Sequence, residues 1–354
     1  MSNDVPKMVE CRPLSERMKH LLPVAYLPEQ KARELADLGD VEIVGEEASK
    51  TETPTPIQVD IGYLKRDRFS KYRQLTRVAW VQDMSRMGGA ELSNCVVVNA
   101  GEQCGFDIIG VTPARFSEDI LYTCDLIVLN NCMEFQPEQF HRLRYHLHER
   151  AIPFVKYEHD YREFKRTNVS QPFFTRSMLN VFLSPKHMER HAKIFGEEIV
   201  ERSAVLPLAI DTNLFTSGIG VDREEDLVLV PNYKKCGKRI DEYMLAHKEY
   251  RYAVIGQVPQ LPGTVEHLPK VPNDQMPKYY SRCAKMLHLP VDYWAGERIY
   301  FEAALCGCTP VVDTEHVGHA SWLLDVSDTA SLKATLDRAP YTFWREVDAC
   351  LSKL

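Results

Sequence analysis

The sequence predicts an α/β protein with two doubly wound parallel sheets behind an extra N-terminal segment. Short apolar runs alternate with helical segments from residue 77 onward, which is typical of parallel sheets covered by helices on both faces. This series runs to about residue 210, and a second one begins near residue 224. The 354 residues are enough for two domains of ordinary size.

The composition is that of a globular protein, with 44% apolar or aromatic residues and 26% charged residues. The formal net charge is -7, so the overall electrostatic field does not favour nucleic acid. A local basic patch remains compatible with this charge.

The ten cysteines are scattered and form no C-x-x-C pair, which predicts reduced thiols in a reducing compartment. The first residues lack the apolar stretch of a signal peptide, and no apolar run approaches the length of a membrane span. We therefore expect a cytoplasmic protein without a transmembrane segment.

Residues 1–76 form an N-terminal extension and linker. A short helix is expected over PEQKARELADLG, followed by VEIV and the polar stretch GEEASKTETPTP. The run from Lys65 to Arg77 then interleaves basic residues with Phe69 and Tyr72. A solvated connector is the favoured interpretation, and a contact with a polyanion or an anionic lipid surface is the alternative.

Residues 77–215 form the predicted first Rossmann-like domain. Its expected strands are RVAWVQD, FDIIGV, DLIVLNN, IPFVKYEHD, NVFLS and AVLPL, with helices over AELSNCVVVNAGEQCG, PEQFHRLRYHLHER and HMERHAKIFG.

Residues 216–330 form the predicted second Rossmann-like domain, and residues 331–354 a C-terminal helix that could cross back to the first domain. Strands are expected at DLVLVPN, RYAVIG, KMLHLPV and TPVVD, with helices over KRIDEYMLAHKEY, VPNDQMPKYYSRC and ERIYFEAALCG. With a hinge near 208–224, a ligand should lie in a cleft facing the carboxyl ends of both sets of strands.

Four constellations could carry chemistry. Gly88 and Gly89 separate a strand from a helix, which suits backbone contact with an anion but is also common in tight turns. His159 lies in EHD at the end of a strand, where it could face a ligand or serve as a structural residue.

A basic cluster follows the strand DLVLVP. The start of the following helix carries four basic residues, Lys234, Lys235, Lys238 and Arg239. Positive charge is unfavourable beside the positive end of the helix dipole unless an anion binds there. The fourth constellation is GERIYFEAALCGCTPVV, in which Glu302 could accept hydrogen bonds from a ribose diol or lie on a solvated helix face.

Other catalytic motifs are absent from the sequence. HMERH does not fit the H-E-x-x-H zinc motif, and neither a G-x-S-x-G elbow nor a P-loop occurs. There is no D-x-D pair for a metal, so no essential metal is expected.

In their order along the chain, the four constellations resemble the two-domain GT-B glycosyltransferases, specifically the retaining GT4-like group. The resemblance covers roughly residues 77–325, and its strongest match is EAALCGCTPVV, close to the family's EAMACGTPVV. It implies that residues 77–215 form the acceptor-side domain and residues 216–330 the nucleotide-sugar-binding domain. It also implies Glu302 as the ribose-binding carboxylate, His159 near the transferred sugar and Lys238 as the phosphate-binding lysine.

The resemblance also implies further donor-binding residues, and His159 and Glu297 as the catalytic residues. The assigned donor-binding residues are Gly88, Gly89, Lys234, Lys238, Val271, Arg298 and Glu302. Two positions depart from the family pattern: Trp294 stands where the family has a glutamate, and Tyr233 where it has an arginine, for which Lys234 and Lys235 are possible substitutes.

The predicted function is metal-independent, retaining transfer of a sugar from a nucleotide-diphospho-sugar to a hydroxyl acceptor. No cofactor is expected beyond this co-substrate. Possible acceptors are a glycan, a lipid-linked sugar, a protein and a hydroxymethylated DNA base, the last through the run Lys65–Arg77. The alternatives are a catalytically silent nucleotide-sugar-binding protein, suggested by Trp294, and a GT-B-fold epimerase.

Overall fold

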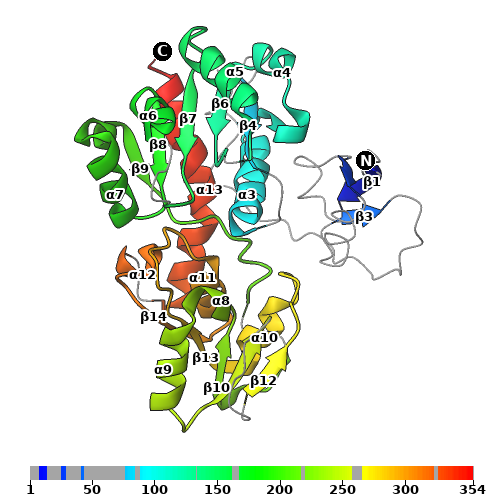
Figure 1. The fold of residues 1–354 in the computed structure, drawn as a ribbon, viewed down its shortest axis with the longest axis vertical. Coiled ribbons are helices and arrows are strands. Elements are labelled where there is room, and N and C mark those ends of the chain that lie inside the picture. Colours follow the sequence, from blue (N-terminus) through cyan, green and yellow to red (C-terminus); the bar gives the residue numbers. More distant parts are fainter. Residues whose placement is uncertain are drawn as a thin grey trace, which may run out of the picture. The chain divides into compact units, whose positions relative to one another are not determined.

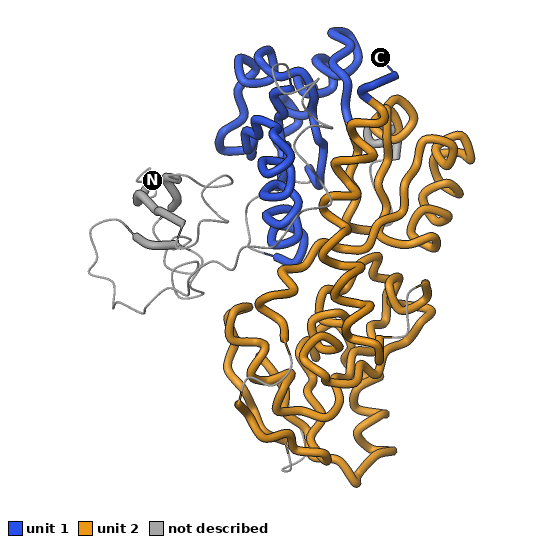
Figure 2. Tube along the Cα trace, turned by 180° about the vertical axis from the view of Figure 1, so that it is seen from behind, with its two compact units in different colours: residues 1–154, 351–354 blue, residues 155–350 orange. Residues whose placement is uncertain are grey.

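The computed structural model describes residues 8–13, 25–28, 41–43, 76–83, 88–132, 134–161, 167–216, 220–256, 265–322 and 326–353. The chain divides into two compact units, residues 1–154 with 351–354 and residues 155–350 (Figure 2). The helix expected over PEQKARELADLG lies outside the described residues, as does the basic run up to residue 75. The domain boundaries expected from the sequence remain predictions.

Three short strands of the N-terminal segment form an antiparallel sheet in the order β2-β1-β3: β1 Met8–Pro13, β2 Ala25–Pro28 and β3 Val41–Ile43. Only β3 coincides with an apolar run noted in the sequence, VEIV. The other two strands are short and end in proline, so their sequences carry little strand signal.

The first parallel sheet has six strands in the order β5-β4-β6-β7-β8-β9 (Figure 1). All six strands were expected from the sequence: β4 Arg77–Val81, β5 Asp107–Val111, β6 Leu126–Leu129, β7 Phe154–Tyr157, β8 Leu179–Phe182 and β9 Ser203–Val205. The strands β6, β7 and β8 are buried along their whole length, as continuous apolar runs predict.

The helices between these strands include the three that the sequence predicted, α3, α5 and α7. The described helices of this region are α3 Gly89–Gln103, α4 Glu118–Tyr122, α5 Pro137–His148, α6 Thr167–Thr175 and α7 Pro185–Phe195, with the 3-10 helices η2 Pro113–Arg115 and η3 Glu197–Arg202. The hydroxyl of Ser184 caps α7 by accepting a hydrogen bond from the amide of His187 at 3.1 Å.

The second parallel sheet has five strands in the order β12-β11-β10-β13-β14. They are β10 Glu224–Val230, β11 Arg251–Ile255, β12 Val265–Leu268, β13 Cys283–His288 and β14 Thr309–Val312. Within β10, Leu227 and Leu229 pack in one hydrophobic cluster, while Val228 and Val230 pack in another. This alternation shows a sheet covered on both faces, as the run DLVLV predicted.

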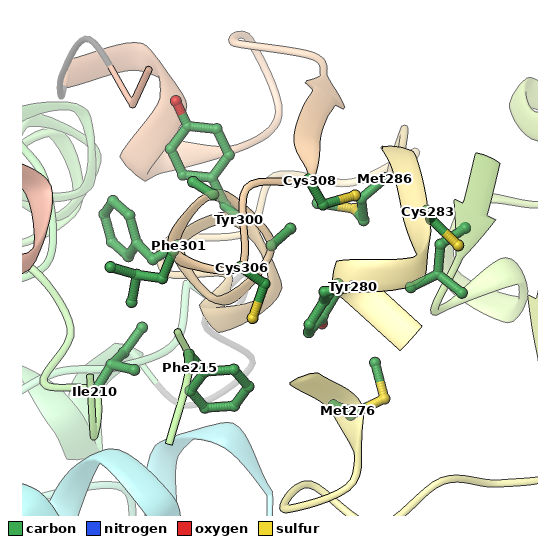
Figure 3. Close-up of a cluster of buried hydrophobic side chains, with 14 of the residues drawn as sticks. Ile210, Phe215, Met276, Tyr280, Cys283, Met286, Tyr300, Phe301, Cys306 and Cys308 are labelled. Atoms are coloured by element: carbon green, nitrogen blue, oxygen red, sulfur yellow. The ribbon is translucent and has the colours of Figure 1, made fainter. Parts of the chain in front are cut away.

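The larger of these two clusters joins the sheet to its helices (Figure 3). Met276 and Tyr280 come from α10, Met286 from β13, and Phe301 and Cys306 from α11 and its C-cap, and all are buried. Among the described residues, the free thiols include Cys124, Cys236, Cys283, Cys306 and Cys308, as the scattered positions of the cysteines predicted. This core holds β13 and α11 together, and the candidate site lies at their adjoining ends.

The helices of this region are α8 Tyr233–Cys236, α9 Lys238–Ala246, α10 Met276–Arg282, α11 Arg298–Leu305, α12 Gly318–Trp322 and α13 Thr329–Leu351. Gly237 separates α8 from α9 with φ 46°, a backbone conformation that favours glycine. In α13, Leu332 and Leu336 pack in the large cluster, while Phe343 lies 5.1 Å from the ring of Tyr157 in β7.

Candidate functional site

The five-stranded sheet has a topological switch point between β10 and β13. From β10 the chain continues outward to β11 and β12, whereas β13 continues to β14 on the other side. In such sheets, ligands bind beyond the carboxyl ends of the two strands at which the order reverses. The residues found there are those of α8, which follows β10, and those between β13 and α11.

Polar and aromatic side chains of these segments form two neighbouring sets, one around Glu297 and one made by the ion pair of Arg298 with Glu302, which we together call the switch-point cluster. Its members are Lys235, His288, Trp294, Glu297, Arg298 and Glu302. Of these, Glu297, Arg298 and Glu302 are site residues assigned from the sequence.

Lys235 is the cation that α8 places in this cluster. Its Nζ lies 3.4 Å from Oε1 of Glu297 and 3.3 Å from the ring centroid of Trp294. An ammonium over the face of an indole is a favourable cation–π geometry. Tyr233, at the position where the family has an arginine, instead donates its hydroxyl to Asp241 at 2.7 Å. Lys235 is therefore the basic side chain of α8 that contacts the cluster.

Glu297 is a buried carboxylate immediately before α11, with 7% of its surface exposed. Besides Lys235, it faces Nε2 of His288 at 3.5 Å. Burial raises the pKa of Glu297, but the contacts with His288 and Lys235 outweigh it, so that the pKa lies below its usual value. Glu297 is thus ionised at neutral pH.

Arg298 and Glu302 form a buried ion pair one turn apart on α11. Nε of Arg298 donates to Oε1 of Glu302 at 2.9 Å, and the guanidinium also donates to the carbonyl of Ala209 at 3.3 Å. The hydroxyl of Tyr280 donates to Oε2 of Glu302 at 3.4 Å. Burial raises the pKa of Glu302, against the lowering effects of Arg298 and Tyr280.

His159 follows β7 and is 4% exposed. Among the residues that the structure describes, neither of its ring nitrogens has a hydrogen-bond partner, and its ring lies 4.2 Å from that of Tyr157. Burial lowers the pKa of His159 to about 3, with positive charges at Lys156 and Arg298 acting in the same direction. The imidazole is therefore neutral and has one N–H donor and one acceptor nitrogen to offer.

His319 on α12 is the second buried neutral histidine of this region. Its Nε2 accepts a hydrogen bond from the amide of Leu208 at 3.4 Å, and its ring lies 4.5 Å from that of Phe301. Burial lowers the pKa of His319 to about 3.

Three of the assigned donor-binding residues are not members of the switch-point cluster as defined above. The Lys238 side chain opens α9 and is 87% exposed, with Nζ 3.4 Å from a carboxylate oxygen of Glu242 on the same helix. Lys234 is also exposed, and Val271 packs against the large hydrophobic cluster. The roles assigned to these residues from the sequence remain predictions.

Gly88 and Gly89 stand at the start of α3, as predicted. The amide of Gly88 donates to Oε2 of Glu91 at 2.8 Å, so the chain's own carboxylate occupies this helix N-terminus. Their expected contact with a diphosphate remains a prediction.

Two buried histidines of this region were not predicted from the sequence as site residues. His288 ends β13 as His159 follows β7, so the same strand-end signal could have identified it. His319 stands in the polar stretch after the last strand and carries no comparable signal, because its partners Leu208 and Phe301 come from distant segments.

Within the described ranges, no group of three or more His, Cys, Asp or Glu side chains is arranged to hold a metal ion. None of the helices described is long and apolar enough to cross a membrane.

No protein-family model matches the chain, and no curated protein matches it in sequence. Solved structures do resemble it. Anabaena HepE in complex with UDP-glucose has 15% identity and a TM-score of 0.56 over 78% of this chain and 100% of HepE. An alpha-glucosyltransferase in complex with UDP and a 13-mer DNA containing a HMU base has 12% identity and a TM-score of 0.51, over 78% of this chain and 97% of that protein. Both neighbours are GT-B glycosyltransferases, and the chain has the GT-B-like fold predicted from its sequence.

Proposed function

We propose that this protein is a glycosyltransferase that moves a sugar from a nucleotide-diphospho-sugar to a hydroxyl acceptor. The observation that carries the proposal is the switch-point cluster, where a cation, a helix N-terminus and buried carboxylates meet at the ligand-binding edge of a GT-B-like sheet. The complexes of HepE with UDP-glucose and of the alpha-glucosyltransferase with UDP support a uridine donor.

In this proposal, fixed cations stabilise the leaving group. Departure of a nucleoside diphosphate leaves negative charge on the phosphates, which must be compensated in the transition state. Lys235 supplies a cation beside the N-terminus of α11, where the helix dipole favours an anion. This arrangement supports a reaction that needs no metal.

Two further residues have proposed roles toward the donor sugar and ribose. The neutral imidazole of His159 would donate to or accept from a sugar hydroxyl. Glu302 would accept from the ribose diol, exchanging its contact with the Tyr280 hydroxyl for the ligand. We propose retention of anomeric configuration on the resemblance to the GT4-like group.

The acceptor belongs to one of four classes: a glycan, a lipid-linked sugar, a protein or a hydroxymethylated DNA base. The neighbour crystallised with HMU-containing DNA supports testing such DNA first.

Trp294 favours a second candidate function, a nucleotide-sugar-binding protein without catalysis. It stands where the GT4-like group has a glutamate, and its ring is covered by Lys235. In this alternative, the cluster binds the diphosphate, while no carboxylate supports the reacting face of the sugar. Release of glucose or its transfer from UDP-glucose distinguishes the enzyme from the binder.

The test of the donor site compares Lys235→Met with Lys238→Met in UDP titrations, with and without a chelator. Loss of a charge-assisted contact should weaken UDP binding by at least about 1.5 kcal/mol in Lys235→Met. We expect a smaller loss in Lys238→Met, because that side chain is exposed and pairs with Glu242. A larger loss in Lys238→Met would return the phosphate role to Lys238, and a wild-type protein that binds neither UDP nor UDP-glucose would reject the donor site.

A further inference from the structure

His288 has no role in the proposed reaction, yet it lies at the centre of a buried polar chain. Its Nδ1 is 3.5 Å from Sγ of Cys236, and its Nε2 is 3.5 Å from Oε1 of Glu297. The side chains of Cys236 and His288 are fully buried, and Glu297 is nearly so. A polar chain of this kind in an apolar surrounding is costly unless its charges balance.

The charged groups around Glu297 come from four elements. Lys235 of α8 and His288 of β13 face its carboxylate directly. His319 of α12 is neutral because burial lowers its pKa to about 3, and Glu302 of α11 is a like charge whose own pKa is raised by burial and by Glu297. Among the described residues, the negative charge of Glu297 is therefore compensated by two groups, Lys235 and His288.

Of these two groups, His288 is fully buried, so it cannot turn away from Glu297 toward a ligand. Burial opposes its protonation, but Cys236 and Glu297 raise the pKa of His288 to about 9. The Lys235 side chain is one third exposed, so it can move toward a ligand. A protonated His288 would keep Glu297 neutralised when Lys235 turns to the diphosphate.

We propose that His288 is a positioning residue: it fixes Glu297 as a carboxylate before α11 and thereby releases Lys235 to bind the diphosphate of the donor. The part of this proposal that concerns the diphosphate rests on the proposed function. The pairing of His288 with Glu297 is independent of that function. Without His288, Lys235 is the remaining cation for Glu297 and must either stay bound to it or leave a buried carboxylate unpaired.

The first experiment tests the pair without any ligand. Histidine ring signals are followed by NMR during a pH titration of the full chain, and His288→Gln assigns the signal. In wild type, His288 should titrate well above the usual value for histidine, near the pKa of about 9. In Glu297→Gln, its pKa should fall by about one unit or more, because the opposing charge is gone. A His288 that titrates at or below the usual value in wild type overturns the proposal.

The second experiment tests the effect on the donor. UDP-glucose is chosen because its diphosphate does not titrate between about pH 5.5 and about pH 8. His288→Gln should weaken its binding by about tenfold at about pH 8, and by less at about pH 5.5, where Glu297 can take up a proton and release Lys235.

The matched control is His146→Gln, since His146 is another buried histidine paired with a glutamate, with Nε2 3.1 Å from Oε2 of Glu118 on α4. It should bind UDP-glucose as wild type does at both pH values.

An equal loss at both pH values in His288→Gln would show a merely structural role and overturn the proposal. If wild type fails to bind UDP-glucose, the proposed function fails, while the titration of His288 still decides the pairing. If His288→Gln does not fold, Glu297→Gln reports on the same pair from the other side.

Discussion

At the scale of single residues, two positions beside the candidate site require glycine because neighbouring atoms leave no room for a Cβ. Their backbone conformation does not itself require glycine. A Cβ on Gly318 would overlap the carbonyl oxygen of Ala295 and lie 2.6 Å from the hydroxyl of Tyr293. A Cβ on Gly296 would overlap Cδ1 of Leu183. The obstacle is thus backbone in the first case and the end of a buried side chain in the second.

We therefore expect Gly318→Ala to lower the free energy of unfolding by about 2–3 kcal/mol, and Gly296→Ala by less, about 1–2 kcal/mol. A leucine methyl can shift by rotation, whereas the Ala295 carbonyl is fixed by the backbone around the bridge between Trp294 and Val317. Urea unfolding of the two variants measures the difference. Equal losses, or a larger loss in Gly296→Ala, would mean that the backbone near Ala295 gives way more easily than these contacts indicate.

At the scale of secondary-structure elements, α3 depends on Glu91 at its first turn. Oε2 of Glu91 accepts from the amide of Gly88 at 2.8 Å, and its charge faces the positive end of the helix dipole. Glu91→Ala should cost about 1 kcal/mol of stability, while Glu91→Gln should cost less than half of this because it keeps the acceptor. Chemical denaturation of both variants checks this difference, and a cost for Glu91→Gln close to that of Glu91→Ala would mean that the charge matters more than the hydrogen bond.

Most strands and helices of the two parallel sheets could be predicted from the sequence, and the exceptions have physical reasons. The strands of both parallel sheets, except β12, were predictable from the sequence. A strand that is buried on both faces of its sheet has a continuous apolar run, as β6 and β10 do. β12 was missed because VEHL is short and half polar, and its two central residues are exposed at the edge of the sheet. The separation of α8 from α9 was also missed, because it depends on the left-handed conformation of Gly237.

The candidate site was predictable in part. Glu297, Arg298 and Glu302 were assigned from the sequence around α11, whereas the residues assigned from the basic cluster were Lys234 and Lys238, with Lys235 only a possible substitute for the family's arginine. Which lysine contacts Glu297 was not predictable, because it depends on the turn at Gly237 that directs Lys235 and Lys238 differently. The pairing of His288 with Glu297 likewise joins separate segments of the chain.

At the scale of the whole molecule, the buried histidines predict how stability depends on pH. Burial lowers the pKa of His159 and His319 to about 3 and that of His191 to about 4. An unfolded chain protonates these groups near pH 6.5, so below this pH the unfolded state binds more protons than the folded state. Stability should therefore rise with pH up to about 6.5.

His288 acts in the opposite direction on the alkaline side. Although burial opposes protonation, Cys236 and Glu297 raise the pKa of His288 to about 9, so between about pH 6.5 and this value the folded state binds the extra proton. One proton difference changes the free energy of unfolding by at most about 1.4 kcal/mol per pH unit, and several act on the acid side. We expect a stability maximum near pH 6.5–7, with a steeper fall toward acid than toward alkali. Urea unfolding across this range tests the shape, and His288→Gln should flatten the alkaline fall while leaving the acid one, since the three neutral histidines are unchanged.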